Sequence, residues 1–343
     1  MNLLYVTSDI PGSGKTLLSL ALAQERIRLN EKVGYFKLMW DTIDSDDDAE
    51  FGYKLTGQTS NDSVSTLKVM TISEMLSCNE DDVVNLVLDK IATVSQTFET
   101  LIIEGPSISI DGRDLTDISR KAIEQSGAKG VIVISGAKGL DNIDWLELNK
   151  TFGEFLSGVL LNSITRYRFN ETVRVMTEQS QKSKMRLLGV IPEDRRLLAV
   201  TMLEIGSYLN CSWVNGCDNS RDLIHNFLIG GNIMDSGETY FGAIDNKVVV
   251  VRGDRPDIQL AALSTSTGGL ILTGGFEPVE YVRHEASELD VPMMIVNSTT
   301  FETVEALGGL IKVANSHHAE KIEMFRDLLF DEGAGINLSG LFN

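Results

Sequence analysis

The chain has 343 residues, of which 43% are hydrophobic and 23% are charged, a globular composition that excludes a disordered or fibrous protein. At roughly 150 residues per domain, this length predicts two domains. The 49 acidic and 30 basic residues give a formal net charge of −19, which opposes nucleic acid and anionic membranes as partners.

The cysteines and the apolar runs indicate the compartment. Cys78, Cys211 and Cys217 are odd in number and form no CxxC pair, as expected for reduced thiols. The N-terminus shows no targeting signal, and no apolar run reaches the roughly 18 residues that a membrane span needs. The sequence therefore predicts a cytoplasmic protein without a membrane segment.

From residue 2, short apolar runs alternate with longer amphipathic stretches, as is typical of strand–helix units on a parallel sheet. Strands are expected at 3–7, 33–38, 100–104, 130–135, 158–161 and 187–191. Helices are expected between them at 15–30, 80–98, 115–126, 168–182 and 195–208. None of the strands alternates in polarity, which indicates burial on both faces. The predicted fold is α/β, with a doubly wound parallel sheet.

This pattern breaks into turn-forming residues at 211–220, CSWVNGCDNS, which predicts a domain boundary. The expected domains are residues 1–215 and 216–343. The second, smaller α/β unit has expected strands at 247–251, 269–272 and 293–296, and helices at 255–266, 278–289 and 300–313. A final amphipathic helix is expected at 317–332 and is assigned to the second domain.

Residues 9–16, DIPGSGKT, predict a phosphate-binding loop between the first strand and the first helix. Gly12, Ser13 and Gly14 form the turn, where the two glycines permit backbone conformations that a side chain would obstruct. Lys15 is the expected contact of the β- and γ-phosphates, and Thr16 is the expected Mg²⁺ ligand. The following helix adds its N-terminal partial charge.

The loop departs from the strict pattern GxxxxGK[ST], because Asp9 stands where that pattern has its first glycine. Two alternatives to a working nucleotide site follow from this departure. The segment could be an ordinary turn that contains GKT, or a vestigial loop on a scaffold protein. The flanking strand and helix favour the nucleotide site.

Two acidic positions are candidates for the metal site. Glu104 ends the apolar strand TLIIE, where a carboxylate can hold Mg²⁺ or its waters. Asp48 lies in the acidic run 41–50, DTIDSDDDAE, and is the preferred member of that run for completing the site. The alternative is that both are solvated, one at a strand end and the other in a loop.

The loop, GYFK at 34–37, the acidic run ending at Asp48, IIEGP at 102–106 and GVLLN at 158–162 together resemble a known ATPase group. They are similar to the dethiobiotin synthetase (BioD-like) and cobyrinate amidotransferase ATPases, and most of all to the N-terminal domain of long-form phosphate acetyltransferase. This P-loop family binds ATP and Mg²⁺ and typically activates a carboxylate or carbamate. The resemblance implies that Asn162 contacts adenine.

The resemblance also implies a site role for Lys37, which matches the lysine that faces the reacting groups in dethiobiotin synthetase. The plain alternative is a solvated lysine after a strand. Residues 38–42 lack the small-residue stretch that handles the substrate in that enzyme, so dethiobiotin synthesis is not expected. Ile10 replaces the special lysine of partitioning and septum-site ATPases, which disfavours a dimer switch of that kind.

Residues 221–330 resemble a DRTGG domain through VVRGDR at 250–255 and ILTGG at 271–275. These motifs follow two strands, and ligands of parallel sheets bind at the carboxyl edge. Candidate ligand residues are therefore Gly253, Asp254, Arg255, Thr273, Gly274 and Gly275. The alternative is that the glycines only form tight turns.

These features favour a nucleotide-binding regulatory module that couples ATP in the first domain to a small-molecule effector, or to a separate acyltransferase protein, at the second. The alternatives are an ATP-dependent ligase and the scaffold. Acetyl transfer is not expected, because the acyl-transfer domain of the resembling enzymes would need roughly 300 further residues, more than two ordinary domains. A homodimer is expected from the resemblance alone.

Overall fold

The computed structural model describes residues 1–40, 46–58, 70–94, 97–136, 140, 143–217, 220–231, 237–331 and 335–342. The chain divides into two compact units. The first unit contains residues 1–194 and 316–343, and the second contains residues 195–315. The chain therefore leaves the first unit, builds the second and returns to the first.

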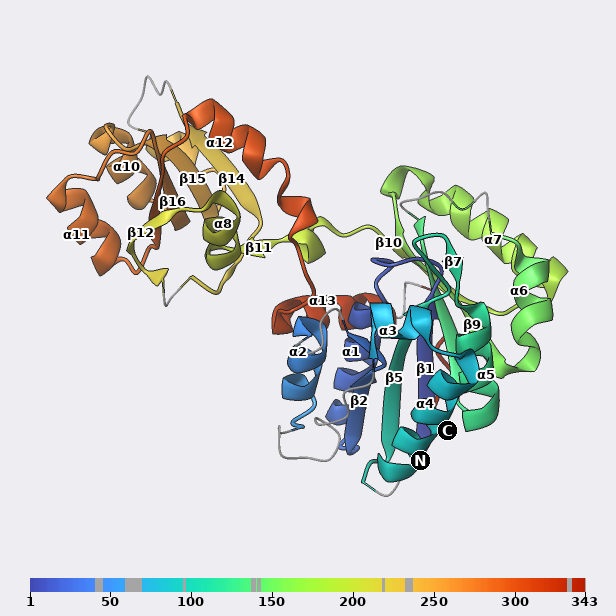
Figure 1. The fold of residues 1–343 in the computed structure, drawn as a ribbon. Helices are drawn as coiled ribbons and strands as arrows, with labels where there is room; N and C mark the ends of the chain where they lie inside the picture. The colour runs from blue at the N-terminus through green and yellow to red at the C-terminus, as the bar shows by residue number, and fades with distance from the viewer. Residues whose placement is uncertain are drawn as a thin grey trace. The chain divides into compact units, whose positions relative to one another are not determined.

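A six-stranded sheet forms the centre of the first unit, and each of its pairings is parallel (Figure 1). Its strand order is β10-β9-β8-β1-β5-β2. The strands are β1 (Asn2–Ser8), β2 (Val33–Lys37), β5 (Thr100–Ser107), β8 (Lys129–Ser135), β9 (Leu156–Ile164) and β10 (Leu187–Pro192). The six apolar runs of the sequence are these strands, and the predicted α/β fold with a parallel sheet is confirmed.

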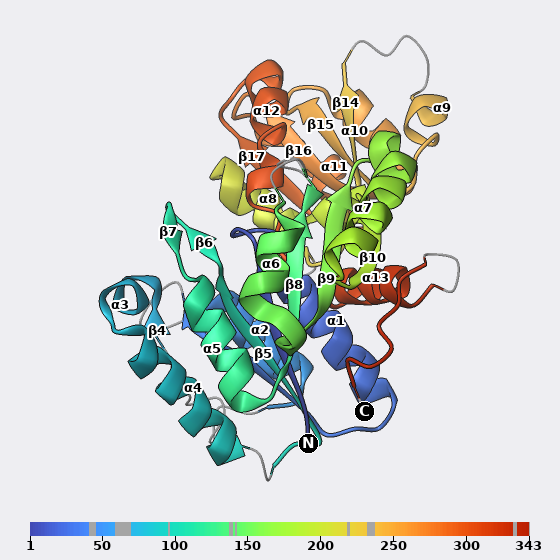
Figure 2. The same ribbon diagram turned by 90° about the vertical axis from the view of Figure 1, so that its right-hand side faces the viewer.

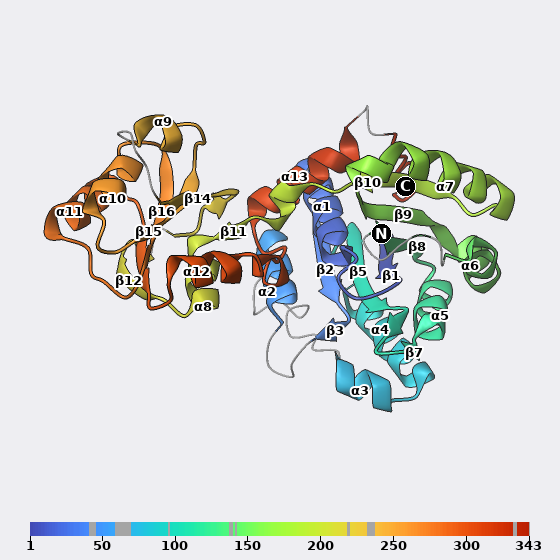
Figure 3. The same ribbon diagram turned by 90° about the horizontal axis from the view of Figure 1, so that it is seen from above.

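Helices pack on both faces of this sheet (Figure 3). On one face, α1 (Lys15–Arg28) packs against α13 (Ala319–Phe330). On the other, α4 (Glu80–Val94) packs against α5 (Thr116–Ser126), and the two run side by side in Figure 2. The remaining α-helices and strands described in the unit are α2 (Asp47–Leu55), α3 (Ile72–Ser77), α6 (Trp145–Phe152), α7 (Phe169–Ser183) and the short strands β3 (Met39–Trp40), β4 (Met70–Thr71), β6 (Ser109–Ile110) and β7 (Arg113–Asp114).

The C-terminal helix packs on a different unit from the one that the sequence predicted. The sequence assigned residues 317–332 to the second domain, but α13 packs against α1 and belongs to the first unit. Its apolar face buries Ile322, Phe325 and Leu329. An amphipathic pattern shows that a helix has a buried face but does not say which core covers it.

The second unit has a five-stranded sheet with the order β12-β17-β16-β15-β14. Its strands are β12 (Ser212–Asn215), β14 (Asn226–Gly230), β15 (Lys247–Arg252), β16 (Thr267–Thr273) and β17 (Met293–Val296), and only β12 runs antiparallel to its neighbour. The other elements are β11 (Val200–Thr201), β13 (Leu223–Ile224), α8 (Met202–Leu209), α9 (Glu238–Phe241), α10 (Pro256–Leu263), α11 (Glu280–Glu288) and α12 (Thr300–Leu307).

The boundary between the units lies earlier than the turn-rich segment at 211–220 suggested. The second unit begins at Arg195, and part of the expected linker is the edge strand β12. The helix expected at 195–208 begins only at Met202, because Thr201 and Glu204 form a capping box at its start. Across the described ranges, no helix combines the length and the apolar character needed to cross a membrane.

Candidate functional site

The predicted phosphate-binding loop connects β1 to α1, which begins at Lys15. Gly12 and Gly14 adopt φ values of 78° and 98°, in the left-handed region that favours glycine. The carboxylate of Asp9 accepts hydrogen bonds from the Ile10 amide at 2.8 Å and the Ser13 hydroxyl at 2.6 Å. Asp9, the residue that departs from the strict motif, therefore stabilises the loop through hydrogen bonds within it.

Asn162, near the end of β9, also holds the loop. Its Nδ2 donates to the carbonyl oxygen of Ser13 at 2.9 Å, and only 5% of the residue is exposed. The structure thus places Asn162 beside the phosphate-binding loop. Its role as an adenine contact stays a prediction.

A side chain at Gly14 would have to displace the side chain of Asn162. A Cβ atom at Gly14 would overlap the side-chain nitrogen Nδ2 of Asn162. The φ of 98° is also strained for any residue other than glycine. Strain of this kind costs on the order of 1–3 kcal/mol. We expect Gly14→Ala to weaken ATP binding by about tenfold or more in a calorimetric titration.

Gly12→Ala is the matched control in the same loop. It has a φ of 78°, but a Cβ atom at Gly12 would meet nothing within 4 Å. It should lose less affinity than Gly14→Ala. Equal losses in the two variants would show that the overlap with Asn162 is not the cause.

Two serines hold the ammonium group of Lys15. Its Nζ donates to Ser8 Oγ at 3.2 Å and to Ser107 Oγ at 2.9 Å, at the ends of β1 and β5. Burial, with repulsion from Lys37, lowers the pKa of Lys15 in spite of nearby carboxylates. Neither serine was predicted from the sequence, although Ser8 directly follows the first apolar run and Ser107 lies three residues after Glu104.

The side chains of Thr16, Glu104 and Asp48, the three candidate metal ligands, lie close together. The Thr16 hydroxyl lies 3.0 Å from Glu104 Oε1 and 3.4 Å from Asp48 Oδ2. Glu104 also accepts a hydrogen bond from the Tyr35 hydroxyl at 2.7 Å. Oxygen atoms from the first turn of α1, from β5 three residues before its end, and from the first turn of α2 therefore lie close together. Hydroxyl and carboxylate oxygens are the ligands that Mg²⁺ prefers.

The two carboxylates differ in their ionisation. Burial raises the pKa of Glu104, although Lys37 and Lys15 oppose this shift. Burial also acts against the charged form of Asp48, but hydrogen bonds and charge from His317 and Lys37 prevail, so its pKa lies below the usual range. A divalent cation at Thr16 would favour the ionised form of Glu104.

Lys37 is enclosed by acidic groups. Its Nζ lies 2.8 and 3.0 Å from the two carboxylate oxygens of Asp46 and 2.7 Å from Asp48 Oδ2. Burial alone would lower the pKa of Lys37, but Glu104, Asp48 and Asp46 raise it above the usual range. Asp46 is also the N-cap of α2 and accepts from the Ala49 amide. Residues 41–45 of the acidic run lie outside the described residues.

Two residues that the sequence analysis did not select reach Asp48 from the C-terminal part of the unit. Ser316 Oγ and His317 Nε2 lie 3.3 and 2.7 Å from Asp48 Oδ1. Both stand just before α13. The structure therefore extends the predicted site with residues that are remote in sequence.

The predicted ligand residues of the second unit lie at the carboxyl ends of β15 and β16, where Thr273 is the last residue of β16 and the other five follow the strands. The amides of Gly253, Gly274 and Gly275 donate to the carbonyls of Thr273, Ser298 and Val296 respectively. Asp254 pairs with Arg252, and Arg255 pairs with Asp257, all on the surface. These amides are therefore bonded to neighbouring segments of the sheet, namely β16, β17 and the residues that follow β17. Ligand binding here stays a prediction.

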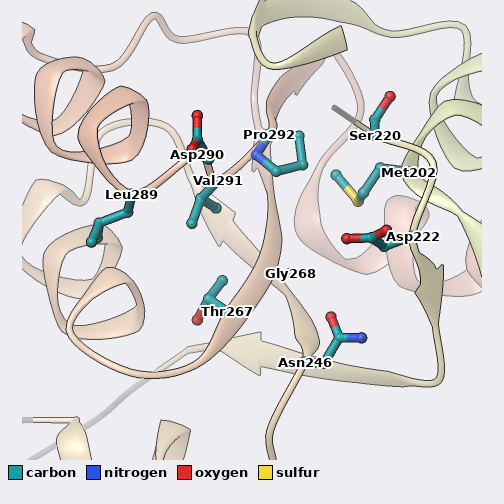
Figure 4. A pocket seen from close by; sticks show the side chains of 10 residues that line it. All are labelled: Met202, Ser220, Asp222, Asn246, Thr267, Gly268, Leu289, Asp290, Val291 and Pro292. Atoms are coloured by element: carbon teal, nitrogen blue, oxygen red, sulfur yellow. The ribbon is translucent and has the colours of Figure 1, made fainter. Parts of the chain in front are cut away.

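A cavity of about 170 Å³ lies elsewhere on the second unit (Figure 4). Asn246, Thr267 and Pro292 line it at the amino ends of β15, β16 and β17. The glycine turns follow the carboxyl ends of β15 and β16. The cavity and the predicted ligand residues are therefore at opposite edges of the sheet.

The profile of the AAA domain family matches residues 2–201, which is more than half of the chain. The chain belongs to the AAA domain family. The DRTGG domain matches residues 204–310 of this AAA-domain chain. These matches confirm the predicted combination of a P-loop, BioD-like domain with a DRTGG domain.

Two curated relatives of the AAA-domain chain are phosphate acetyltransferases. The chain is 23% identical to the enzyme of Synechocystis sp. over 88% of its own length and 46% of the relative's. It is 25% identical to the enzyme of Nitratidesulfovibrio vulgaris over 43% of its length and 22% of that enzyme. The matches cover the N-terminal part of these enzymes, so the chain spans less than half of the relatives it matches.

Solved structures resemble the AAA-domain chain at low identity. The MinC:MinD cell division complex of Aquifex aeolicus matches with 16% identity and a TM-score of 0.39, over 58% of this chain and 84% of that one. The CBS and DRTGG domains of a Clostridium perfringens pyrophosphatase, complexed with diadenosine tetraphosphate, match with 13% identity and a TM-score of 0.31, over 42% and 71%. These likenesses carry no functional conclusion.

Proposed function

We propose that the first unit binds ATP with Mg²⁺ and that the chain is a nucleotide-dependent regulatory module, similar to the front part of phosphate acetyltransferase. The observation that carries this proposal is the position of the Thr16 hydroxyl, 3.0 Å from Glu104 and 3.4 Å from Asp48. P-loop proteins hold Mg²⁺ with this hydroxyl and an acidic residue at a strand end.

The loop and its neighbours fit the phosphates of the nucleotide. The amides of the glycine turn and the N-terminus of α1 attract phosphate oxygens. The Lys15 ammonium, held by Ser8 and Ser107, can exchange these hydroxyls for a phosphate. Bound Mg²⁺ would neutralise part of the phosphate charge, with Thr16, Glu104 and Asp48 as its protein ligands.

The contacts of Lys37 support a binding module more than a ligase. A ligase of the resembling kind needs this lysine at the reacting groups. Here Asp46 and Asp48 bracket its ammonium at 2.8 and 2.7 Å. We infer that Lys37 mainly neutralises these carboxylates and fixes the start of α2.

Calorimetric titration with ATP, in Mg²⁺ and then in EDTA, tests the proposed function. We expect one ATP per chain, bound more tightly in Mg²⁺ than in EDTA. The absence of any ATP binding would favour the scaffold alternative. Sustained ADP release that is stimulated by a small carboxylate and lost in Lys37→Ala would instead favour the ligase.

For the second unit we propose that it binds a ligand or partner, and that this binding is coupled to the nucleotide of the first unit. Its DRTGG match supports this role, together with the candidate residues Gly253, Asp254 and Arg255. The proposed ligand is a small-molecule effector, and a separate acyltransferase protein is the alternative partner. Effector screening by thermal shift, with Arg255→Ala as the comparison, tests this part.

A further inference from the structure

The chain returns from the second unit to the first through three consecutive hydrogen-bonded residues, which we call the return segment, 315–317. Asn315 is the last residue of the second unit, and its Nδ2 donates to Glu204 Oε1 at 2.6 Å. Ser316 and His317 belong to the first unit and contact Asp48 there. Adjacent residues of one short segment are therefore fastened to different units.

The two oxygens of Asp48 have different neighbours. Oδ2 lies on the site side, 2.7 Å from Lys37 Nζ and 3.4 Å from Thr16 Oγ1. Oδ1 lies 2.7 Å from His317 Nε2 and 3.3 Å from Ser316 Oγ. One oxygen is thus turned to the candidate metal position, while the return segment holds the other.

A second contact fixes the ring of His317. Its centroid lies 5.9 Å from that of Phe51, with an interplanar angle of 45°. Phe51 is three residues after Asp48 in α2, so both side chains lie on the same helical face. The imidazole therefore contacts α2 through a hydrogen bond and a ring contact together.

We propose that Ser316 and His317 are positioning residues for Asp48, and that through them Mg²⁺ binding depends on the return segment and hence on the second unit. This inference rests on the proposed function. Because hydrogen bonds hold Oδ1, the carboxylate of Asp48 is already oriented with Oδ2 toward the candidate metal position. Loss of such an outer contact typically weakens metal binding by about 10–100-fold.

The test is a Mg²⁺ titration of ATP binding by the full chain. His317→Ala should raise the half-saturating Mg²⁺ concentration about tenfold and leave the ATP affinity in EDTA unchanged. His317→Gln, which keeps an Nε2 donor, should recover most of the loss. His284→Ala, the control, removes an exposed histidine from α11. Its half-saturating Mg²⁺ concentration should equal that of the wild type.

Asn315→Ala tests the link to the second unit. Releasing the return segment from Glu204 should raise the half-saturating Mg²⁺ concentration by about threefold. A wild-type value in this variant overturns the dependence on the second unit. Wild-type Mg²⁺ dependence in His317→Ala overturns the positioning role. Failure of the wild-type chain to bind ATP refutes the proposed function instead, so the failures are distinguishable.

Discussion

Lys15→Ala is expected to abolish detectable Mg²⁺-dependent ATP binding. The Lys15 ammonium lies within hydrogen-bond reach of Ser8 and Ser107, at the carboxyl ends of β1 and β5, where the phosphates of a nucleotide would lie. It is the charge that the loop itself supplies to the β- and γ-phosphates, and charge-assisted hydrogen bonds contribute about 1.5–3 kcal/mol each. Two such bonds correspond to a loss of roughly a hundredfold or more in affinity.

The control for this prediction is Lys150→Ala, which removes a lysine whose side chain is 77% exposed on α6. Both variants should unfold at temperatures close to that of the wild type, because neither replaces an apolar core side chain. Calorimetry should then separate them. If Lys15→Ala and Lys150→Ala bind Mg²⁺ and ATP equally well, the loop is not the nucleotide site.

Phe325→Ala is expected to destabilise the first unit by about 3–5 kcal/mol, the usual cost of removing a buried phenylalanine. Phe325 is 0% exposed and lies on the buried face of α13, the helix that packs against α1. Because α1 begins with the phosphate-binding loop, the same variant should reduce the stabilisation that ATP provides. Chemical denaturation with and without Mg²⁺ and ATP measures both effects.

Phe301→Ala is the matched control, since Phe301 is 76% exposed in α12 of the second unit. The free energy of unfolding of Phe301→Ala should stay within about 0.5 kcal/mol of the wild-type value. Equal stability of the two variants would contradict the assignment of α13 to the core of the first unit.

The central parallel sheet was predictable because its strands are short apolar runs buried on both faces. The edge strands of the second unit carry less of this signal. In β14, Phe227 and Ile229 are 36% and 43% exposed, and β12 is polar enough to be mistaken for a linker. The partner of α13 could not be predicted, because the hydrophobic pattern of a helix does not name the surface that it covers.

The local part of the candidate site was also predictable, since Lys15 and Thr16 follow a glycine turn at a fixed spacing. Glu104 could be selected because strands of a parallel sheet end at a common edge. His317 could not be selected, because it lies 269 residues from Asp48 in sequence and carries no motif. Asp46, the second carboxylate at Lys37, was missed because nothing in the acidic run indicates which carboxylate caps α2.

The divided first unit has a consequence for synthesis on the ribosome. Residues 1–194 emerge first, but α13, which packs against α1, emerges only after the whole of residues 195–315. While the second unit is being made, α1 therefore lacks the packing of α13. The first unit is therefore completed only after residues 195–315 have been made, so a ribosome that stalls within the second unit leaves a product without α13 on α1.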